Sequence, residues 1–236
     1  ATRETDKIPE LEAVAPMRIA SIDVVGSGSM GTGIAQAFAA SGLAVVITDA
    51  DKQAAERAVE RIGKSLNKRV EQGKISRQRA ADVLGRISIA KDWGDISKAD
   101  LVVEAVLEDV AVKRAVMSQI EAVCRDDAII ASNTSTIDLD ILAEELANPQ
   151  RLIGLHFFYP AHAMPLVEVI RRADTGAGVI ATAVKLVKDI HKTPILVKDG
   201  PGFLVNRILF PYLFAFQMLV IEGVPIEKID KTMEGY

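Results

Sequence analysis

Two side chains of this sequence, His156 and Glu168, are suited to moving a proton together. Removing a hydride from an alcohol requires a base for the hydroxyl proton, and histidine is suited because its ordinary pKa lies near neutrality. An imidazole base also needs an acceptor to orient its other nitrogen, commonly a buried carboxylate. Glu168 interrupts the apolar run 166–170, where a carboxylate without a partner is costly to bury. If the two strands pair side by side, these side chains meet. For His156 alone, a core histidine bonded to the backbone is the alternative.

Other polar side chains follow the carboxyl ends of predicted strands. Ligands of an open α/β sheet bind at that edge, so these side chains are candidates for binding or catalysis. They are Glu104, Glu108 and Lys113 in and after the run 100–106, Ser135 after the run 128–132, and Asn206 early in an apolar helix. Each has a structural alternative: Ser135 could cap the next helix, Asn206 could cap a turn, and Lys113 could be a surface charge.

A glycine turn stands between an apolar run at residues 19–25 and a helical pattern. Its sequence is Gly26-Ser27-Gly28-Ser29-Met30-Gly31, a G-x-G-x-x-G in the strand–turn–helix order of a dinucleotide site. Gly26 allows the tight turn, Gly28 leaves room for a pyrophosphate, and Gly31 lets the helix pack close to the strand. The helix N-terminus at Ser29 and Met30 would face the phosphates. A glycine turn that joins strand and helix without a ligand is the alternative.

Asp49 follows the second apolar run, residues 43–48, at about the ~20-residue distance expected of a carboxylate that binds a ribose 2′-hydroxyl. Asp49 and Asp51 would repel a 2′-phosphate, and no arginine follows directly, which favours NAD over NADP. The alternative for Asp49 is the N-cap of the next helix.

Strand-length apolar runs alternate with helical patterns along the chain. We expect strands at residues 19–25, 43–48, 86–90, 100–106, 128–132, 152–158, 166–170 and 194–197. We expect helices from the glycine turn to about residue 41 and at 52–72, 76–84, 111–123, 138–146, 176–191, 203–222 and 226–234. Six strands alternating with helices predict a doubly wound sheet, and the last two strands could extend it antiparallel.

The helix at 203–222 is apolar on nearly every face, so it must be surrounded, yet only one short helix follows it. The expected fold class is therefore α/β: a doubly wound, mostly parallel Rossmann sheet followed by the start of an all-helical C-terminal domain. We expect a linker or arm at residues 1–17, an NAD-binding domain at 18–200, and at 201–236 the truncated beginning of a helical substrate or dimerisation domain.

The composition argues against several classes of protein. The 236 residues carry a formal net charge of −4, which is not typical of a nucleic-acid-binding surface. The single cysteine, Cys124, excludes an internal disulfide and is typical of a reducing compartment. The apolar stretch 209–221 is shorter than the ~20 residues of a membrane span and contains Pro211, so we expect a buried helix there. We expect no metal ion.

Five motifs in order resemble the L-3-hydroxyacyl-CoA dehydrogenase family. They are Gly26-Ser27-Gly28-Ser29-Met30-Gly31-Thr32-Gly33-Ile34-Ala35, Ser132-Asn133-Thr134-Ser135, His156-Phe157-Phe158, Leu166-Val167-Glu168-Val169 and Pro201-Gly202-Phe203-Leu204-Val205-Asn206-Arg207. The likeness runs from about Arg18 to the end of the chain. The arm before Arg18 is similar to the linker that follows the enoyl-CoA hydratase domain in multifunctional fatty-acid oxidation enzymes.

The resemblance implies NAD-dependent oxidation of an L-3-hydroxyacyl-CoA to the 3-ketoacyl-CoA in fatty acid β-oxidation. It implies that His156 is the general base and that Glu168 orients it and stabilises its charged form. The remaining implied roles are substrate oxygen binding by Ser135 and Asn206, adenosine ribose binding by Asp49, cofactor contacts by Glu108 and Lys113 near the nicotinamide-side ribose, and coenzyme A contacts by Ser65 and Lys74. Tyr159 departs from the family, which often has Asn or Ser there, and a phenol could change the pocket or the substrate preference.

Related functions remain as alternatives. They are a 3-hydroxybutyryl-CoA dehydrogenase, a dehydrogenase of a free hydroxy or sugar acid such as gulonate, and a non-catalytic NAD-binding protein. The resemblance further implies an acyl-CoA substrate and either a homodimer or a multidomain chain with an enoyl-CoA hydratase domain. We expect a cytoplasmic location of the bacterial type, with the peroxisome and the mitochondrion as alternatives.

Overall fold

The computed structural model describes residue 11 and residues 13–235 of the chain. The predicted arm at residues 1–17 falls largely on residues 1–10 and 12, which lie outside the described residues, as does residue 236. The end of this stretch is attached to the body of the protein, because the backbone N–H of Met17 donates a hydrogen bond to Oγ1 of Thr182 (2.8 Å).

An eight-stranded sheet forms the centre of the fold, with its strands in the order β3-β2-β1-β4-β5-β6-β7-β8. The strands are β1 (Ser21–Val25), β2 (Ala44–Thr48), β3 (Ile87–Ile89), β4 (Leu101–Glu104), β5 (Ile129–Ser132), β6 (Leu152–Phe157), β7 (Leu166–Arg171) and β8 (Thr193–Lys198). Strands β1 to β6 are parallel, in the order of a doubly wound dinucleotide-binding sheet. Strand β7 is antiparallel to β6, and β8 is parallel to β7, which confirms the antiparallel extension.

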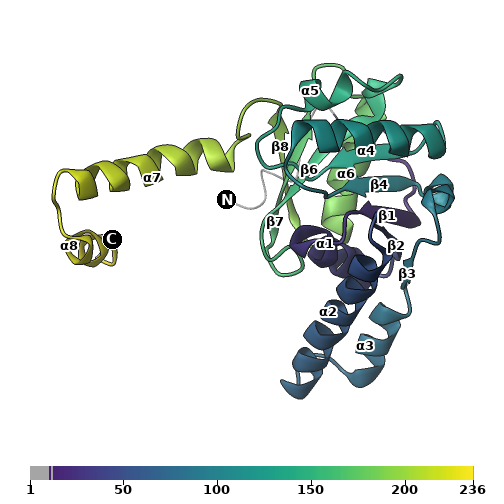
Figure 1. The fold of residues 1–236 in the computed structure, drawn as a ribbon, viewed down its shortest axis with the longest axis horizontal. Coiled ribbons are helices and arrows are strands. Elements are labelled where there is room, and N and C mark those ends of the chain that lie inside the picture. The colour runs from purple at the N-terminus through teal and green to yellow at the C-terminus, as the bar shows by residue number, and fades with distance from the viewer. Residues whose placement is uncertain (1–10, 12, 236) are drawn as a thin grey trace.

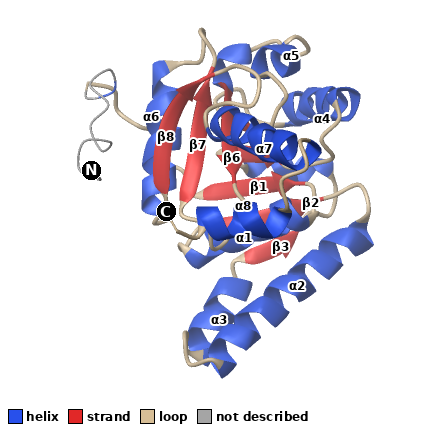
Figure 2. Cartoon of the chain, turned by 90° about the vertical axis from the view of Figure 1, so that its left-hand side faces the viewer, coloured by secondary structure: helices blue, strands red, loops and turns tan. Residues whose placement is uncertain are grey.

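Helices cover both faces of the sheet and continue beyond it (Figure 2). They are α1 (Ser29–Ala40), α2 (Lys52–Glu71), α3 (Arg77–Leu84), α4 (Val110–Val123), α5 (Leu139–Ala143), α6 (Ala177–Asp189), α7 (Val205–Ile221) and α8 (Ile226–Met233). The sequence did not predict the short 3₁₀ helices η2 (Trp93–Lys98) and η3 (Pro149–Arg151), and α5 is shorter than the expected 138–146.

The core has two parts because the side chains of each strand alternate between the faces of the sheet. Val103 of β4 joins the cluster under α1, α2, α3 and α6, whereas Val102 joins the cluster under η2, α4 and α5. A central strand covered on both faces is apolar at consecutive positions, as β4 is.

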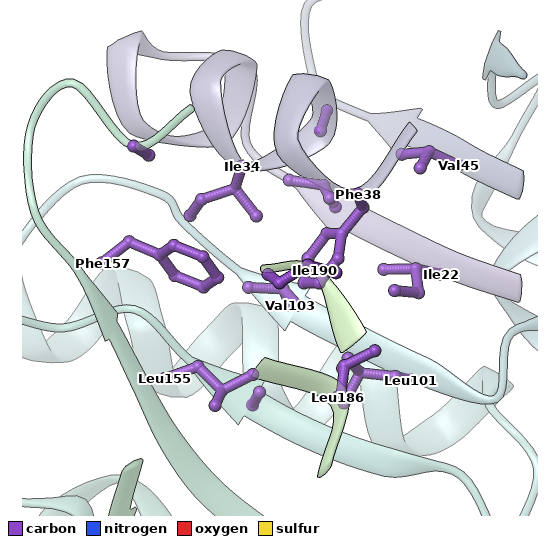
Figure 3. Close-up of a cluster of buried hydrophobic side chains, with 14 of the residues drawn as sticks. Ile22, Ile34, Phe38, Val45, Leu101, Val103, Leu155, Phe157, Leu186 and Ile190 are labelled. Atoms are coloured by element: carbon purple, nitrogen blue, oxygen red, sulfur yellow. The ribbon is translucent and has the colours of Figure 1, made fainter. Parts of the chain in front are cut away.

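An aromatic pair fixes α1 against β6 inside the first of these clusters (Figure 3). Phe38 and Phe157 are fully buried and meet edge to face, with ring centroids 5.9 Å apart. Because Phe157 points into this cluster, its neighbour His156 points to the opposite face of β6. The packing of one side chain thus sets the direction of the next.

Helix α7 extends away from the sheet (Figure 1), and none of its residues is buried within the described part of the chain. Its exposed side chains include large apolar residues on several sides: Ile208, Phe210, Tyr212, Phe214, Met218 and Ile221. The expectation of a buried helix is therefore wrong for this chain by itself, because the chain does not cover that surface. None of the helices within residues 11 and 13–235 has both the length and the apolar character needed to cross a membrane.

A buried carboxylate in β1 is a feature that sequence reasoning missed. Asp23 is fully buried, and its Oδ2 accepts a hydrogen bond from Oγ1 of Thr48 (3.0 Å). Its Oδ1 has no hydrogen-bond partner among the described residues. Burial raises the pKa of Asp23 to about 7, and Thr48 offsets only part of this effect. The negative charge of Asp95 adds to the increase in pKa.

This raised pKa predicts that the protein loses stability as the pH rises toward neutrality. Above the ordinary aspartate value of 3.8 the unfolded chain releases the Asp23 proton, while the folded chain keeps it until about pH 7. The free energy of unfolding should therefore fall between these values, by up to about 1.4 kcal/mol per pH unit from this group. Asp23→Asn should be more stable than the parent at pH 8 and similar to it near pH 4. Urea unfolding of both proteins at the two pH values tests this, and a pH-independent difference would contradict it.

Candidate active site

The glycine turn after β1 has the geometry that the sequence predicted for each glycine. Gly26 has a φ of +102°, and a Cβ there would lie 2.6 Å from the carbonyl oxygen of Ala105. A Cβ on Gly31 would lie 1.9 Å from the carbonyl oxygen of Gly26, so α1 packs directly against the turn. A Cβ on Gly28 would meet nothing within 4 Å. Gly28 therefore leaves open space at the N-terminus of α1.

A cavity of about 640 Å³ begins at this open space. Its walls come from the carboxyl ends of β1, β2, β4 and β5, the edge where open α/β sheets bind ligands. The predicted site residues that line it are Gly26, Gly28, Ser29, Met30, Asp49, Glu108 and Ser135. Another cavity, of about 400 Å³, lies beside the residues that precede β1 and β2, and it contains none of the predicted site residues.

Asp49 holds the glycine turn in place at one end of the 640 Å³ cavity. Its Oδ2 accepts hydrogen bonds from the backbone N–H and the hydroxyl of Ser27 (2.7 and 2.6 Å). Its Oδ1 accepts from the N–H of Asp51 (2.9 Å). The N-cap of α2 is Asp51, whose side chain accepts from the N–H of Gln53, so the alternative reading of Asp49 as the cap is wrong.

Sequence reasoning missed Arg61, which binds the other side of the turn from α2. Its guanidinium donates to the carbonyl oxygen of Ser27 (2.7 Å) and to Oγ1 of Thr32 (3.0 Å). This arginine therefore uses its Nη2 on acceptors of the protein itself. The carboxylate that lines this end of the cavity is Asp49, and its negative charge disfavours a 2′-phosphate.

Lys113 is buried, with 1% exposure, and does not line the cavity. Its Nζ donates to Oε1 of Glu104 (2.7 Å) and lies 3.3 Å from Oε2 of Glu108. Glu104 is fully buried and also accepts from the hydroxyl of Ser132 (2.6 Å) and the N–H of Val106 (2.7 Å). The alternative of Lys113 as a surface charge is therefore wrong. Lys113 acts on the cavity through Glu108, which does line it.

Glu108 organises the loop that carries Ser135. Its Oε1 accepts from the hydroxyl of Thr134 (2.6 Å) and from the N–H groups of Ser135 (2.8 Å) and Thr136 (3.2 Å). Burial raises the pKa of Glu108, but these hydrogen bonds and the charge of Lys113 outweigh burial and hold the pKa below its usual value. Thr134 accepts from the N–H of residue 137 (3.0 Å), so Thr134, rather than Ser135, caps the following turn.

The predicted His–Glu contact is present. His156 and Glu168 are direct partners in the antiparallel pairing of β6 with β7, and Nδ1 of His156 lies 2.7 Å from Oε2 of Glu168. Both side chains are buried, at 4% and 0% exposure. Burial raises the pKa of Glu168, but its bonds to His156, Val205 and Leu204 outweigh burial and lower the pKa below its usual value. In the neutral form of the ring, a hydrogen on Nδ1 that is donated to the Glu168 carboxylate leaves a lone pair on Nε2.

The first residues of α7 lie against the loop that carries Ser135. The side-chain amide of Asn206 donates to the carbonyl oxygen of Ser135 (3.0 Å), which joins α7 to the loop after β5. Asn206 therefore does not cap a turn. Asn133, which belongs to the motif at residues 132–135 but received no role from the sequence, lines the cavity and accepts from the N–H of Phe157 (2.9 Å). A polar side chain directly after a predicted strand was the available signal for Asn133.

Ser65 and Lys74, the two residues expected to contact coenzyme A, do not line the same cavity. Ser65 lies on α2, accepts from Nε2 of Gln36 (3.3 Å), and lines a small cavity of about 170 Å³ between α1, α2 and the loop after β6. Tyr159 lines the same cavity and is 72% exposed. Lys74 is exposed in the turn after α2 and does not line this cavity. Within the described residues, no group of three or more potential ligand side chains could hold a metal ion.

Replacing Gly28 and Gly31 by alanine should separate binding from folding. Gly28 has a φ of −62°, which alanine adopts freely, so Gly28→Ala should fold with nearly parental stability. Its methyl group would occupy the open space. We expect the affinity for NADH to fall roughly tenfold or more, and a tenfold fall is a loss of about 1.4 kcal/mol of binding free energy. Gly31→Ala should instead lose about 1–3 kcal/mol of stability because its Cβ overlaps the Gly26 carbonyl.

Fluorescence titration with NADH and urea unfolding of the two variants distinguish these effects. Parental NADH affinity in Gly28→Ala would show that the open space does not receive the cofactor.

Comparison with known protein families finds a matching family model for each of the two parts of the chain. Residues 21–200 match the family model described as 3-hydroxyacyl-CoA dehydrogenase, NAD binding domain, and residues 202–236 match the 3-hydroxyacyl-CoA dehydrogenase C-terminal domain. A curated relative, the fatty acid oxidation complex subunit alpha of Pseudomonas aeruginosa, is 45% identical over 213 residues. That match covers 90% of this chain and 30% of the relative, so the chain spans less than a third of the length of that relative.

Solved structures of dehydrogenases are also similar to this chain. The (S)-3-hydroxybutyryl-CoA dehydrogenase of Ralstonia eutropha is 38% identical, with a TM-score of 0.90 over 92% of this chain and 77% of that one. The dehydrogenase part of multifunctional enzyme 1 from C. elegans is 28% identical, with a TM-score of 0.74 over 94% of this chain and 51% of that one.

Proposed function

Because the chain belongs to the 3-hydroxyacyl-CoA dehydrogenase family, we propose that it oxidises an L-3-hydroxyacyl-CoA to the 3-ketoacyl-CoA with NAD, as a step of fatty acid β-oxidation. The observation that carries this proposal is the buried contact between His156 and Glu168, which leaves Nε2 of the histidine free to accept a proton. The 640 Å³ cavity for the cofactor reaches the loop of Ser135, which Asn206 joins to α7.

In this mechanism the O–H bond of the substrate hydroxyl breaks as its proton moves to Nε2 of His156. Glu168 stabilises the imidazolium that forms and keeps the ring in its reactive orientation. Ser135 and Asn206 hold the reacting oxygen as it becomes a carbonyl. Bound in the 640 Å³ cavity, NAD would supply the acceptor for the hydride that leaves the carbon bearing the reacting hydroxyl. In the reverse direction His156 returns its proton to the new alcohol oxygen.

The residues around the large cavity fit NAD. The open side of Gly28 and the N–H groups of Ser29 and Met30 suit the pyrophosphate, because a helix N-terminus attracts anions. Asp49 suits the hydroxyls of the adenosine ribose, and its charge disfavours NADP. We assign the nicotinamide-side ribose to Glu108, with Lys113 acting through Glu108; the position of Glu108 in the cavity wall and its contact with Lys113 support this assignment.

The remaining assignments concern the substrate and the parent protein. Ser65 and Lys74 contact coenzyme A in this proposal. The exposed Tyr159 lines the same small cavity as Ser65, where it can affect substrate preference. Residues 18–200 form the NAD-binding unit, and residues 201–236 begin a helical unit for substrate binding or dimerisation. From the resemblance we further propose a multidomain parent with an enoyl-CoA hydratase domain in a bacterial cytoplasm. The match covers only 30% of the relative from Pseudomonas aeruginosa, which supports a longer parent.

The direct test is NADH oxidation driven by acetoacetyl-CoA, with the protein in its natural full length. Turnover supports the proposal, and a comparison with longer 3-ketoacyl-CoA substrates separates it from a dedicated 3-hydroxybutyryl-CoA dehydrogenase, which the Ralstonia eutropha structure makes the second candidate. NADH binding without turnover of any acyl-CoA would reject the proposed substrate, and free hydroxy acids would be assayed next.

A further inference from the structure

The carboxylate of Glu168 has a second set of partners, which its role beside His156 does not require. While Oε2 contacts His156, Oε1 accepts hydrogen bonds from the backbone N–H groups of Leu204 (2.9 Å) and Val205 (2.8 Å). These two amides belong to the start of α7, outside the sheet. Among the described residues, the hydrogen-bond partners of the Glu168 carboxylate therefore come from His156 and from the start of this helix.

The contact also completes the N-terminus of α7. A helix begins with N–H groups that have no partner within the helix, and a side chain at the N-cap usually accepts from them. The N-cap of α7 is Leu204, which offers no side-chain acceptor. Glu168 supplies the missing acceptor from β7, and the positive end of the helix dipole favours its negative charge.

The contacts of Phe203 give the start of α7 a defined position against the pair formed by His156 and Glu168. It is buried, and its ring centroid lies 5.7 Å from that of His156. Its φ of +51° is unusual for a residue with a side chain and persists only where the surroundings enforce it. The aromatic contact, the two amides and the bond from Asn206 to Ser135 all come from four consecutive residues.

We propose that the start of α7 controls the base: the N–H groups of Leu204 and Val205 are positioning groups that keep Glu168 ionised, so that His156 is active only when α7 is in place. The inference rests on the proposed function, because it concerns the same dyad. Loss of either amide would leave the buried carboxylate less stabilised, so that it would take up a proton at a higher pH.

Val205 offers a way to remove one amide with little other change. It is the first residue of α7, the position where proline is best tolerated in a helix. Val205→Pro removes the N–H, whereas Val205→Ala retains it and serves as the matched control. We expect the acid-side midpoint of the kcat profile for hydroxyacyl-CoA oxidation to move up by about one pH unit in Val205→Pro, the size expected for a hydrogen bond to a charged group. The midpoint of the Val205→Ala profile should match that of the parent, because the N–H group is retained.

A merely structural role for Val205 would lower kcat at every pH and leave the midpoint unchanged, and that result would overturn the inference. Proline also restricts the residue before it, so Val205→Pro could fold poorly. In that event, replacing the amide of residue 205 by an ester, through incorporation of the α-hydroxy acid analogue of valine, removes the same N–H without a ring and should move the midpoint in the same direction.

A readout that is independent of turnover distinguishes this inference from the proposed function. The imidazole NMR signal of His156, followed against pH, should titrate at a different pH in Val205→Pro than in Val205→Ala. A shifted NMR titration in a protein without acyl-CoA turnover would reject the function and keep the inference. Turnover with identical titrations in the two variants would keep the function and reject the inference.

Discussion

Replacing His156 by alanine is expected to reduce kcat by about 10²–10⁴-fold, because the substrate hydroxyl then loses the general base that accepts its proton. Glu168 is a poor substitute, because it is fully buried and its Oε1 stays bound to the backbone N–H groups of Leu204 and Val205 in the variant. The affinity for NADH should change little, because His156 does not line the large cavity. The measurement is NADH oxidation by acetoacetyl-CoA, with NADH binding followed by fluorescence.

The control is another histidine of the same chain. His191 is exposed at the end of α6 and has a φ of +59°, a conformation that asparagine tolerates. His191→Asn should retain parental kcat. If His156→Ala turned over at the parental rate, His156 would not be the base. If parent and variant were both inactive but bound NADH equally well, a non-catalytic NAD-binding protein would be the better description.

Replacing Lys113 by methionine is expected to lower the free energy of unfolding by about 3–5 kcal/mol, the usual cost of removing one partner of a buried ion pair. Methionine fills a similar volume, so the effect isolates the charge. Without the ammonium group, Glu104 keeps Ser132 and Val106 as partners but has no positive charge beside it. Glu108 loses a cation 3.3 Å away, so NADH binding should weaken as well.

Urea unfolding measures the change, and Lys185 provides the matched control. Lys185 pairs with Asp189 one helical turn away on α6, with both side chains about half exposed. Solvent screens such a pair, so Lys185→Met should change stability by only a few tenths of a kcal/mol. The double variant Glu104→Gln, Lys113→Met should recover part of the loss, because it leaves fewer unpaired charges. Equal losses in Lys113→Met and Lys185→Met would show that burial does not set the strength of the Glu104 pair.

The sequence alone determined the order of strands and helices and the parallel sheet. Most strands are short, largely apolar runs, and most helices have a periodic pattern of apolar residues, so the signal lies within one stretch of chain. It also determined the steric roles of Gly26, Gly28 and Gly31, because a glycine turn between strand and helix has few possible geometries. The contact between His156 and Glu168 was predictable because a carboxylate in an apolar strand needs a partner nearby.

Only the tertiary structure decided the partners that come from distant parts of the chain. Lys113 has the sequence context of a surface lysine, and its burial follows from where α4 packs against β4 and β5. The hydrogen bonds of Glu108 and the pairing of Asp23 with Thr48 depend on how the loops and strands meet at the carboxyl edge of the sheet.

The start of α7 is the clearest example of contacts that could not be predicted from the sequence. The sequence placed Asn206 in the site by resemblance, but nothing local indicated that two backbone amides of this helix would bind Glu168. Backbone donors carry no side-chain signature, and their direction is set by the turn at Gly202 and Phe203, where φ is positive at both residues. Local sequence thus fixes which elements form, while the charges of the site depend on contacts that exist only after those elements have packed.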